Sequence, residues 1–135
     1  MSNITQVVNT DKNMTTLKKG VHASDLDQLL SSTGPFTLFA PVNLAFEKLE
    51  EGAVKNLLEP ENKTALTSLL SVHVVPGKLS FNDLKDGEKL KSLGGKELLV
   101  TITDNEVRID GSLIQSHDIK TTNGVMHTLD TVLTN

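Results

Sequence analysis

The chain is 135 residues long, has 13 basic and 17 acidic side chains for a formal net charge of −4, and contains no cysteine. This length predicts a single domain, residues 1–135, whose core is large enough to be stable without cross-links. The missing cysteines exclude disulfides and thiolate metal sites, and the acidic balance argues against nucleic-acid binding.

The N-terminal part has helical periodicity. Residues 4–8 and 14–21 are predicted as short helices, because their apolar side chains recur at helical spacing. Ser24 and Asp27 have the spacing of a capping box, with Asp in place of the usual Glu. They predict the start of a helix that buries Leu26, Leu29 and Leu30.

A buried strand that turns sharply into a short helix is predicted within residues 34–49. A Gly-Pro turn signal precedes residues 36–40, which are rich in strand formers. Pro41 lacks a backbone donor and should end the strand. Asn43 is a favoured capping residue, and Phe46 belongs to the apolar face of the helix that we expect Asn43 to cap.

The middle of the chain continues with short helices. Apolar spacing predicts helices at residues 54–58 and 65–70, and the second runs into a β-favouring segment, Val72–Val75, predicted as an inner strand. A Pro-Gly turn follows. Ser80 then has an acidic residue three positions later and is predicted to cap a short helix that runs through Phe81 and Leu84 to Gly87.

The period changes from helix to strand in the second half. Strands are predicted at residues 98–102 and 107–109, joined by an Asp-Asn turn at 104–105. A short strand at 113–114 and a final segment at 125–133 complete the pattern. Helices followed by strands predict an α+β architecture.

Three stretches in this order resemble the signatures of one family. Residues 37–46 (TLFAPVNLAF), 69–77 (LLSVHVVPG) and 123–130 (NGVMHTLD) resemble the fasciclin-like domain, in the form of a single-domain, bacterial-type member. Val72 departs from the family pattern, which often has Tyr before the motif histidine. The resemblance implies a wedge-shaped β-sandwich with several short helices packed along one side. It also implies that these positions are structural signatures: Thr37, Pro41, Asn43, Phe46, Asn123, Gly124 and His127.

The four histidines are the main candidates for chemistry. None of them has a second His or a Cys at a metal-binding spacing. His73 and His127 lie among apolar residues and are predicted to be buried and hydrogen-bonded, whereas His22 and His117 should be solvated. The sequence also lacks a GxSxG elbow, a phosphate-binding loop and an EF-hand spacing. We therefore expect no catalytic residues, no metal and no cofactor.

The resemblance implies a non-enzymatic module for cell adhesion or for binding an extracellular protein. The second motif is then the expected contact, through Val72, His73, Val74, Val75 and Pro76. We expect a protein or cell-surface partner, no nucleic acid and a monomer, located at the cell surface, in the extracellular matrix or in the cell envelope.

An alternative function stays open, in which the chain is an intracellular accessory subunit that docks onto a larger complex. The N-terminus lacks the shape of a secretory signal, and no stretch has the apolar length of a membrane span. A native start at Met1 would therefore place the protein in the cytoplasm.

Overall fold

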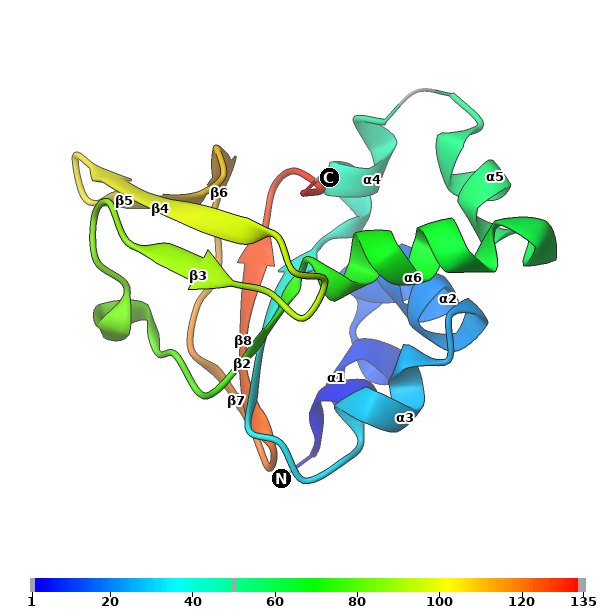
Figure 1. Ribbon diagram of the computed structural model, residues 1–135, viewed down its shortest axis with the longest axis horizontal. Coiled ribbons are helices and arrows are strands. Elements are labelled where there is room, and N and C mark those ends of the chain that lie inside the picture. Colours follow the sequence, from blue (N-terminus) through cyan, green and yellow to red (C-terminus); the bar gives the residue numbers. More distant parts are fainter. Residues whose placement is uncertain (1, 50, 134–135) are drawn as a thin grey trace.

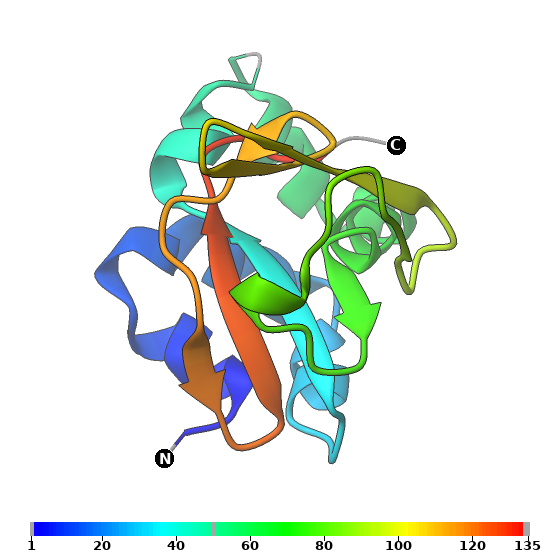
Figure 2. The same cartoon turned by 90° about the vertical axis from the view of Figure 1, so that its left-hand side faces the viewer.

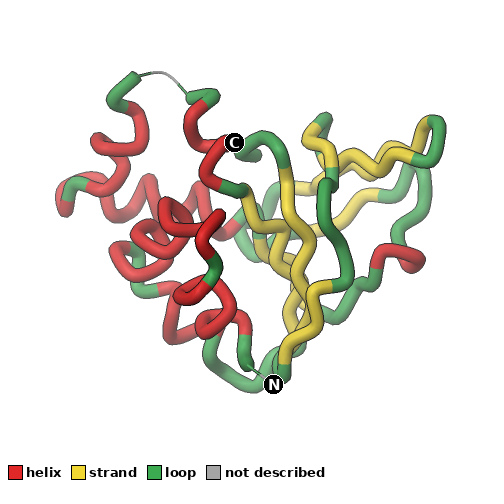
Figure 3. Tube along the Cα trace, turned by 180° about the vertical axis from the view of Figure 1, so that it is seen from behind, coloured by secondary structure: helices red, strands yellow, loops and turns green. Residues whose placement is uncertain are grey.

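The computed structural model describes residues 2–49 and 51–133. The helices, with short 3₁₀ turns marked η, are α1 (Ile4–Thr10), η1 (Lys12–Met14), α2 (Thr15–Ala23), α3 (Leu26–Leu30), α4 (Asn43–Glu47), α5 (Ala53–Leu58), η2 (Pro60–Asn62), α6 (Lys63–Ser71) and η3 (Phe81–Asp83). The strands are β1 (Phe36–Pro41), β2 (Val74–Pro76), β3 (Lys89–Lys91), β4 (Glu97–Thr103), β5 (Glu106–Ile109), β6 (Ser112–Leu113), β7 (Ile119–Thr121) and β8 (Gly124–Leu129). The α helices gather on one side of the strands (Figures 1 and 3).

The central layer is a sheet with the strand order β2-β1-β8-β7. β1 runs parallel to β8 in a register that pairs Phe36 with Gly124 and Pro41 with Leu129. Both strands are covered on both faces, because every residue of β8 and every residue of β1 after Phe36 is buried. The pairing joins the first strand of the chain to its last and so closes the domain.

Alternation along β1 divides the interior into two cores, because successive side chains point to opposite faces of a strand. Leu38 and Ala40 contact the core under the helices, together with Leu17, Leu66 and other apolar residues. Phe39 contacts the core between the two sheets instead. The central sheet is therefore the middle of three layers.

The second sheet has the order β3-β4-β5-β6 and faces the central sheet at an angle (Figures 1 and 2). Asp104 and Asn105 form the predicted hairpin turn between β4 and β5, with φ of 52° and 69°, as the common two-residue hairpin turn requires. Val107 and Ile109 are buried while Arg108 is partly exposed. The two sheets with helices along one side confirm the predicted α+β, wedge-shaped sandwich.

Glycine at position 124 is required by a close approach between strands. A Cβ atom there would lie 1.8 Å from the carbonyl oxygen of Phe36, well inside van der Waals contact. Any side chain would push β1 and β8 apart at the start of their pairing. The expected structural role of Gly124 thus has a steric cause.

The predictions for the start of α3 and the start of β2 are wrong. The Ser24–Asp27 capping box does not form, because Ser24 Oγ donates to the carbonyl oxygen of Val21 and Asp25, with φ of 62°, precedes α3 without a side-chain cap. The predicted strand Val72–Val75 begins only at Val74. Val72 is the C-cap of α6, so the helix extends further toward the strand than β propensity indicated.

Candidate functional site

The second-motif segment is mostly interior. Val72, His73, Val74 and Val75 are each at most 4% exposed, whereas Pro76 is exposed. This strand is at the edge of the central sheet, and its outer side is covered where the N–H of Leu93 donates to Val74 O at 2.8 Å. Partner binding by this segment stays a prediction, and in this conformation a contact would pass through Pro76 and the loop that follows.

His73 is a buried structural residue, as predicted. Its Nε2 accepts the backbone N–H of Leu133 at 2.9 Å, so the ring proton lies on Nδ1, which donates to the carbonyl oxygen of Leu69 at 2.9 Å. Burial lowers the pKa of His73 to about 4, against a smaller opposing effect of the Leu69 bond. The neutral ring therefore connects the end of α6 to the C-terminal segment.

Thr37 fixes the loop that leaves β2. Its hydroxyl donates to the carbonyl oxygen of Gly77 at 2.7 Å and accepts the N–H of Leu79 at 2.8 Å. The side chain is fully buried, so an apolar replacement would leave both backbone groups without partners. The expected structural role of Thr37 is thus to attach this loop to the central sheet.

His127 holds the same loop from the neighbouring strand. Nε2 donates to the carbonyl oxygen of Leu79 at 2.8 Å, and Nδ1 accepts the N–H of Asp118 at 3.2 Å. The ring stacks on Phe39 with centroids 5.7 Å apart. Burial lowers the pKa of His127, although the Leu79 bond and the Asp118 carboxylate oppose the shift.

Asp118 continues the network to the surface. Its Oδ1 accepts the N–H of Phe81 at 2.9 Å, and its Oδ2 lies 3.2 Å from Nδ1 of His117. The hydrogen bond from Phe81 is the main cause that lowers the pKa of the Asp118 carboxyl. The rings of Phe81 and His117 are stacked, with centroids 3.9 Å apart and an interplanar angle of 19°.

These contacts define a surface that we call the loop platform, made of residues 76–81 together with His117 and Asp118. Pro76, Lys78 and His117 are exposed on it, and Phe81 is partly exposed. It adjoins η3, the short green helix on the side of the molecule away from α1–α6 in Figure 1, which faces the viewer in Figure 2. Part-buried hydrogen bonds thus connect this exposed surface to the central sheet.

Asn43 does not cap the helix that follows it, contrary to prediction. Val42 occupies the N-cap position of α4. The Asn43 side chain accepts the N–H of Thr16 at 3.0 Å and donates to Lys12 O at 3.2 Å and Thr15 Oγ1 at 3.0 Å. It therefore supplies an acceptor to an N–H in the first turn of α2, a different helix, and joins that helix to the start of α4.

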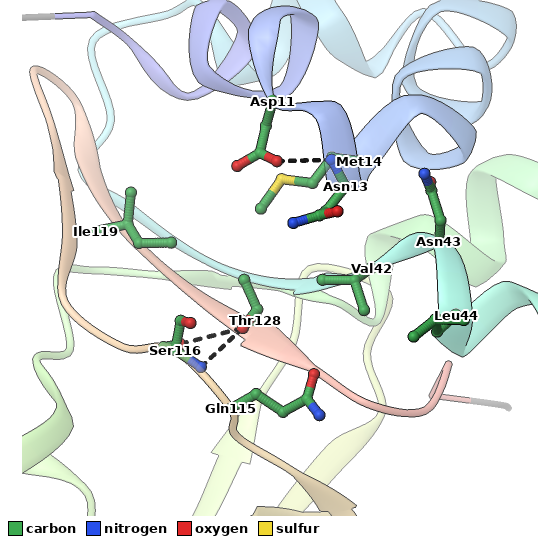
Figure 4. Close-up of a pocket in the computed structure, with 10 residues that line it drawn as sticks. All are labelled: Asp11, Asn13, Met14, Val42, Asn43, Leu44, Gln115, Ser116, Ile119 and Thr128. Carbon is green, nitrogen blue, oxygen red and sulfur yellow. Dashed lines mark hydrogen bonds between the residues drawn. The ribbon is translucent and has the colours of Figure 1, made fainter.

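Asn43 also lines a pocket of about 280 Å³ between η1, α4 and the segment that leads into β7 (Figure 4). Met14, Val42 and Ile119 supply apolar surface there. The carboxylate of Asp11 accepts the N–H of Asn13 at 2.8 Å, and Thr128 Oγ1 accepts the N–H of Ser116 at 2.8 Å. These polar groups are engaged in local structure, so the lining gives no sign of a general acid or a nucleophile.

Asn123 links three parts of the chain from a buried position. Its Nδ2 donates to the carbonyl oxygens of Leu30 at 2.7 Å and Ser32 at 2.8 Å. Its Oδ1 accepts the N–H of Ile4 at 3.1 Å and lies 3.4 Å from Thr121 Oγ1. The start of α1, the end of α3 and the β7–β8 turn thus meet at one side chain.

The remaining residues singled out from the sequence lie in the core, at a strand end or on the surface. Phe46 is 7% exposed and packs in the core under the helices, and Pro41 is the last residue of β1. The side chains of His22 and His117 are 43% and 46% exposed, as predicted. Over residues 2–49 and 51–133, no group of three or more His, Asp or Glu side chains could hold a metal ion.

Sequence reasoning missed Asp118 and Phe81 as members of the network. The available signal was indirect: Thr37 and His127 are polar residues inside apolar strands, and a buried polar group needs a partner. That signal indicates that Thr37 and His127 have hydrogen-bond partners, but it does not identify the partner residues.

The Fasciclin domain family model matches residues 12–135. The chain belongs to the fasciclin domain family. Protein sll1483 of Synechocystis sp. (strain ATCC 27184 / PCC 6803 / Kazusa) is 41% identical over 130 residues, which cover 96% of this chain and 72% of that protein. The transforming growth factor-beta-induced protein ig-h3 of Sus scrofa is 34% identical over 134 residues, which cover 98% of this chain but 19% of that longer protein.

A solved structure supports the same fold for this fasciclin domain. It contains a FAS1 domain pair from the insect cell adhesion molecule Fasciclin I, and it matches with a TM-score of 0.88 at 20% identity. The match covers 99% of this chain and 51% of that one, as expected for one domain aligned with a pair. Within the described part of this fasciclin domain, no helix is both long and apolar enough to cross a membrane.

Proposed function

We propose that this fasciclin domain is a non-enzymatic attachment module that binds an extracellular protein or a cell surface through the loop platform. The observation that carries the proposal is the network from Thr37 through Leu79, His127 and Asp118 to Phe81. Its hydrogen bonds hold the exposed loop residues at neutral pH, and a surface held in its binding conformation loses less entropy on association.

Family membership supports adhesion as the kind of binding. The structural relative is described as a cell adhesion molecule. We propose the same class of function here, with the protein outside the cell or in the cell envelope. Protease treatment of intact cells tests the location: an extracellular or envelope protein is degraded, and a protein that survives until the cells are lysed contradicts it.

Attachment of cells to protein-coated wells tests the function. Cells of the organism that carries the gene should attach to wells coated with the folded protein more than to wells coated with albumin. The double variant Lys78→Glu/His117→Ala alters two exposed platform residues. It should raise the coating concentration that gives half-maximal attachment by about tenfold, as expected for loss of a contact near 1.4 kcal/mol.

A matched control changes the same residue types on the helical side. Lys55 and His22 are both exposed there, so Lys55→Glu/His22→Ala should attach like the wild type. Equal attachment by the platform variant, or no attachment above albumin, would contradict the proposal. Thermal melts of both variants establish that the proteins compared are folded.

A further inference from the structure

We propose that His127 and Asp118 form a pH-operated switch that reshapes the loop platform. The use of the switch in attachment rests on the proposed function, whereas the conformational change itself belongs to the fold. The two residues come from adjacent segments of the central sheet and its edge, and they meet through a single hydrogen bond between a ring nitrogen and a backbone N–H.

The observed arrangement requires a neutral ring. The backbone N–H of Asp118 is a donor, so Nδ1 of His127, 3.2 Å away, must be an acceptor. The ring proton is then on Nε2, where it is donated to the carbonyl oxygen of Leu79 at 2.8 Å. Nε2 is therefore a donor and Nδ1 an acceptor, and after protonation only the donor role of Nε2 is kept.

Protonation of His127 places a proton on Nδ1, opposite the N–H of Asp118. Two donors then face each other in a buried position, which is unfavourable unless one of them finds an acceptor. The Asp118 carboxylate belongs to the same residue and can take the new proton as a charge-assisted hydrogen bond. A turn of Asp118 that carries the carboxylate to Nδ1 moves its oxygens away from the N–H of Phe81 and from His117, which they contact now.

The backbone of Asp118 favours this rearrangement. Its φ is 57°, in the left-handed region that costs a non-glycine residue energy. In the neutral state the bonds to His127 and Phe81 hold it there. When His127 is charged, a turn of this peptide relieves the backbone and brings the carboxylate toward the ring.

The groups that face His127 set the direction of the pH response. The segment before β7 contributes Asp118, which favours the charged ring, and His117, which opposes it. β1 contributes the stacked ring of Phe39, and the loop after β2 contributes the carbonyl oxygen of Leu79. Burial outweighs these effects, so the platform keeps its observed form near neutral pH and changes on acidification.

The change should release Phe81. Loss of the Asp118 bond frees the N–H of Phe81, and loss of the His117–Asp118 contact removes the group that orients the His117 ring on which Phe81 stacks. Acid therefore alters the two residues that give the platform its aromatic surface, while the bond from Nε2 to Leu79 remains.

A pH titration followed by NMR tests the switch without any partner. In the wild type, the backbone amide signals of Asp118 and Phe81 should shift along the same titration curve as the His127 ring, with a midpoint below pH 6.5. In His127→Asn the side-chain oxygen can accept the Asp118 N–H but cannot be protonated, so this shared inflection should disappear. In His117→Gln the inflection should remain.

A second variant keeps the test decisive if His127→Asn does not fold. Asp118→Asn keeps an N–H and tolerates the left-handed backbone, but it lacks the charged acceptor, so the His127 midpoint should move to lower pH. An unmoved midpoint in Asp118→Asn overturns the proposal. An Asp118 amide that ignores His127, or that follows His117 instead, overturns it as well.

Attachment measured across the same pH range separates this proposal from the function. Attachment without an NMR transition refutes the switch and leaves the function standing. An NMR transition in a protein that attaches at no pH refutes the function and leaves the switch standing.

Discussion

The side-chain oxygen of Asn43 accepts the backbone N–H of Thr16 at 3.0 Å, across 27 residues of sequence. Asn43 thereby stabilises α2, whose N-cap position is occupied by Met14 without a side-chain cap. The N-terminal helices and the start of α4 are joined at this point, and a change at Asn43 should affect both.

Asn43→Ala should lower the free energy of unfolding by about 1 kcal/mol, the usual cost of losing a capping acceptor. Asn43→Asp is the matched control, because it keeps an acceptor and adds a negative charge near the N-terminus of α2, while it loses the donors to Lys12 and Thr15. Its stability should lie between those of Ala and wild type. Urea unfolding of the three proteins measures this, and an unchanged midpoint for Ala would show that the α2 contact contributes nothing.

Asn123→Asp should be more destabilising than Asn123→Ala, although Asp is closer in shape. The two donors of Asn123 reach carbonyl oxygens of Leu30 and Ser32, so a carboxylate there would face two acceptors in a buried site. Ala should cost about 1–3 kcal/mol through unpaired backbone groups. Denaturant unfolding at neutral pH ranks the variants, and an Asp variant as stable as wild type would contradict the donor assignment.

The sequence predicted the helices and strands more reliably than it predicted which strands pair with each other. Alternating residues in 107–109 and the Asp-Asn turn before them specified the β4–β5 hairpin locally. The parallel pairing of β1 with β8 joins residues about ninety positions apart, and no local pattern encodes that register. Only the family resemblance indicated the sandwich.

The errors and omissions at the site have the same cause. Asn43 has the chemistry of a cap, but a side chain can cap any helix that lies near it in space. Asp118 reaches the platform because its backbone is left-handed, and an Asp residue in a sequence is only a weak indication of that conformation. The burial of His73 and His127 was predictable from their apolar neighbours, whereas the identities of their hydrogen-bond partners depend on tertiary contacts.

Chelation should leave the stability unchanged. The described side chains contain no group of three or more His, Asp or Glu placed to hold a metal ion, and a structural metal would contribute its binding energy to folding. Thermal melts with and without EDTA should therefore superimpose. A midpoint that falls by several degrees in EDTA would reveal a site that this geometry does not contain.

The last prediction concerns the pH dependence that His73 gives to folding. The pKa of His73 is lowered from 6.5 in the reference state to about 4 in the folded protein. Below pH 6.5, His73 binds a proton in the unfolded chain but not in the folded chain. The free energy of unfolding therefore falls as the pH decreases toward 4, and the effect of His73 on it is constant below that pH. The loss over that window should be roughly 3 kcal/mol at most, since each pKa unit corresponds to about 1.4 kcal/mol.

A pair of variants separates His73 from the other titrating groups. His73→Gln has an amide that can accept the N–H of Leu133, the role that Nε2 has now, and it does not titrate. It should be less stable than wild type at pH 7 but should lose less stability between pH 6.5 and 4. His73→Ala leaves the Leu133 N–H unpaired and opens a cavity, so it should cost a few kcal/mol at neutral pH. Urea unfolding could instead show that wild type and His73→Gln lose the same stability over this window. His73 would then not be the residue whose pKa is lowered on folding, and a neutral ring with two hydrogen bonds would be the wrong description of it.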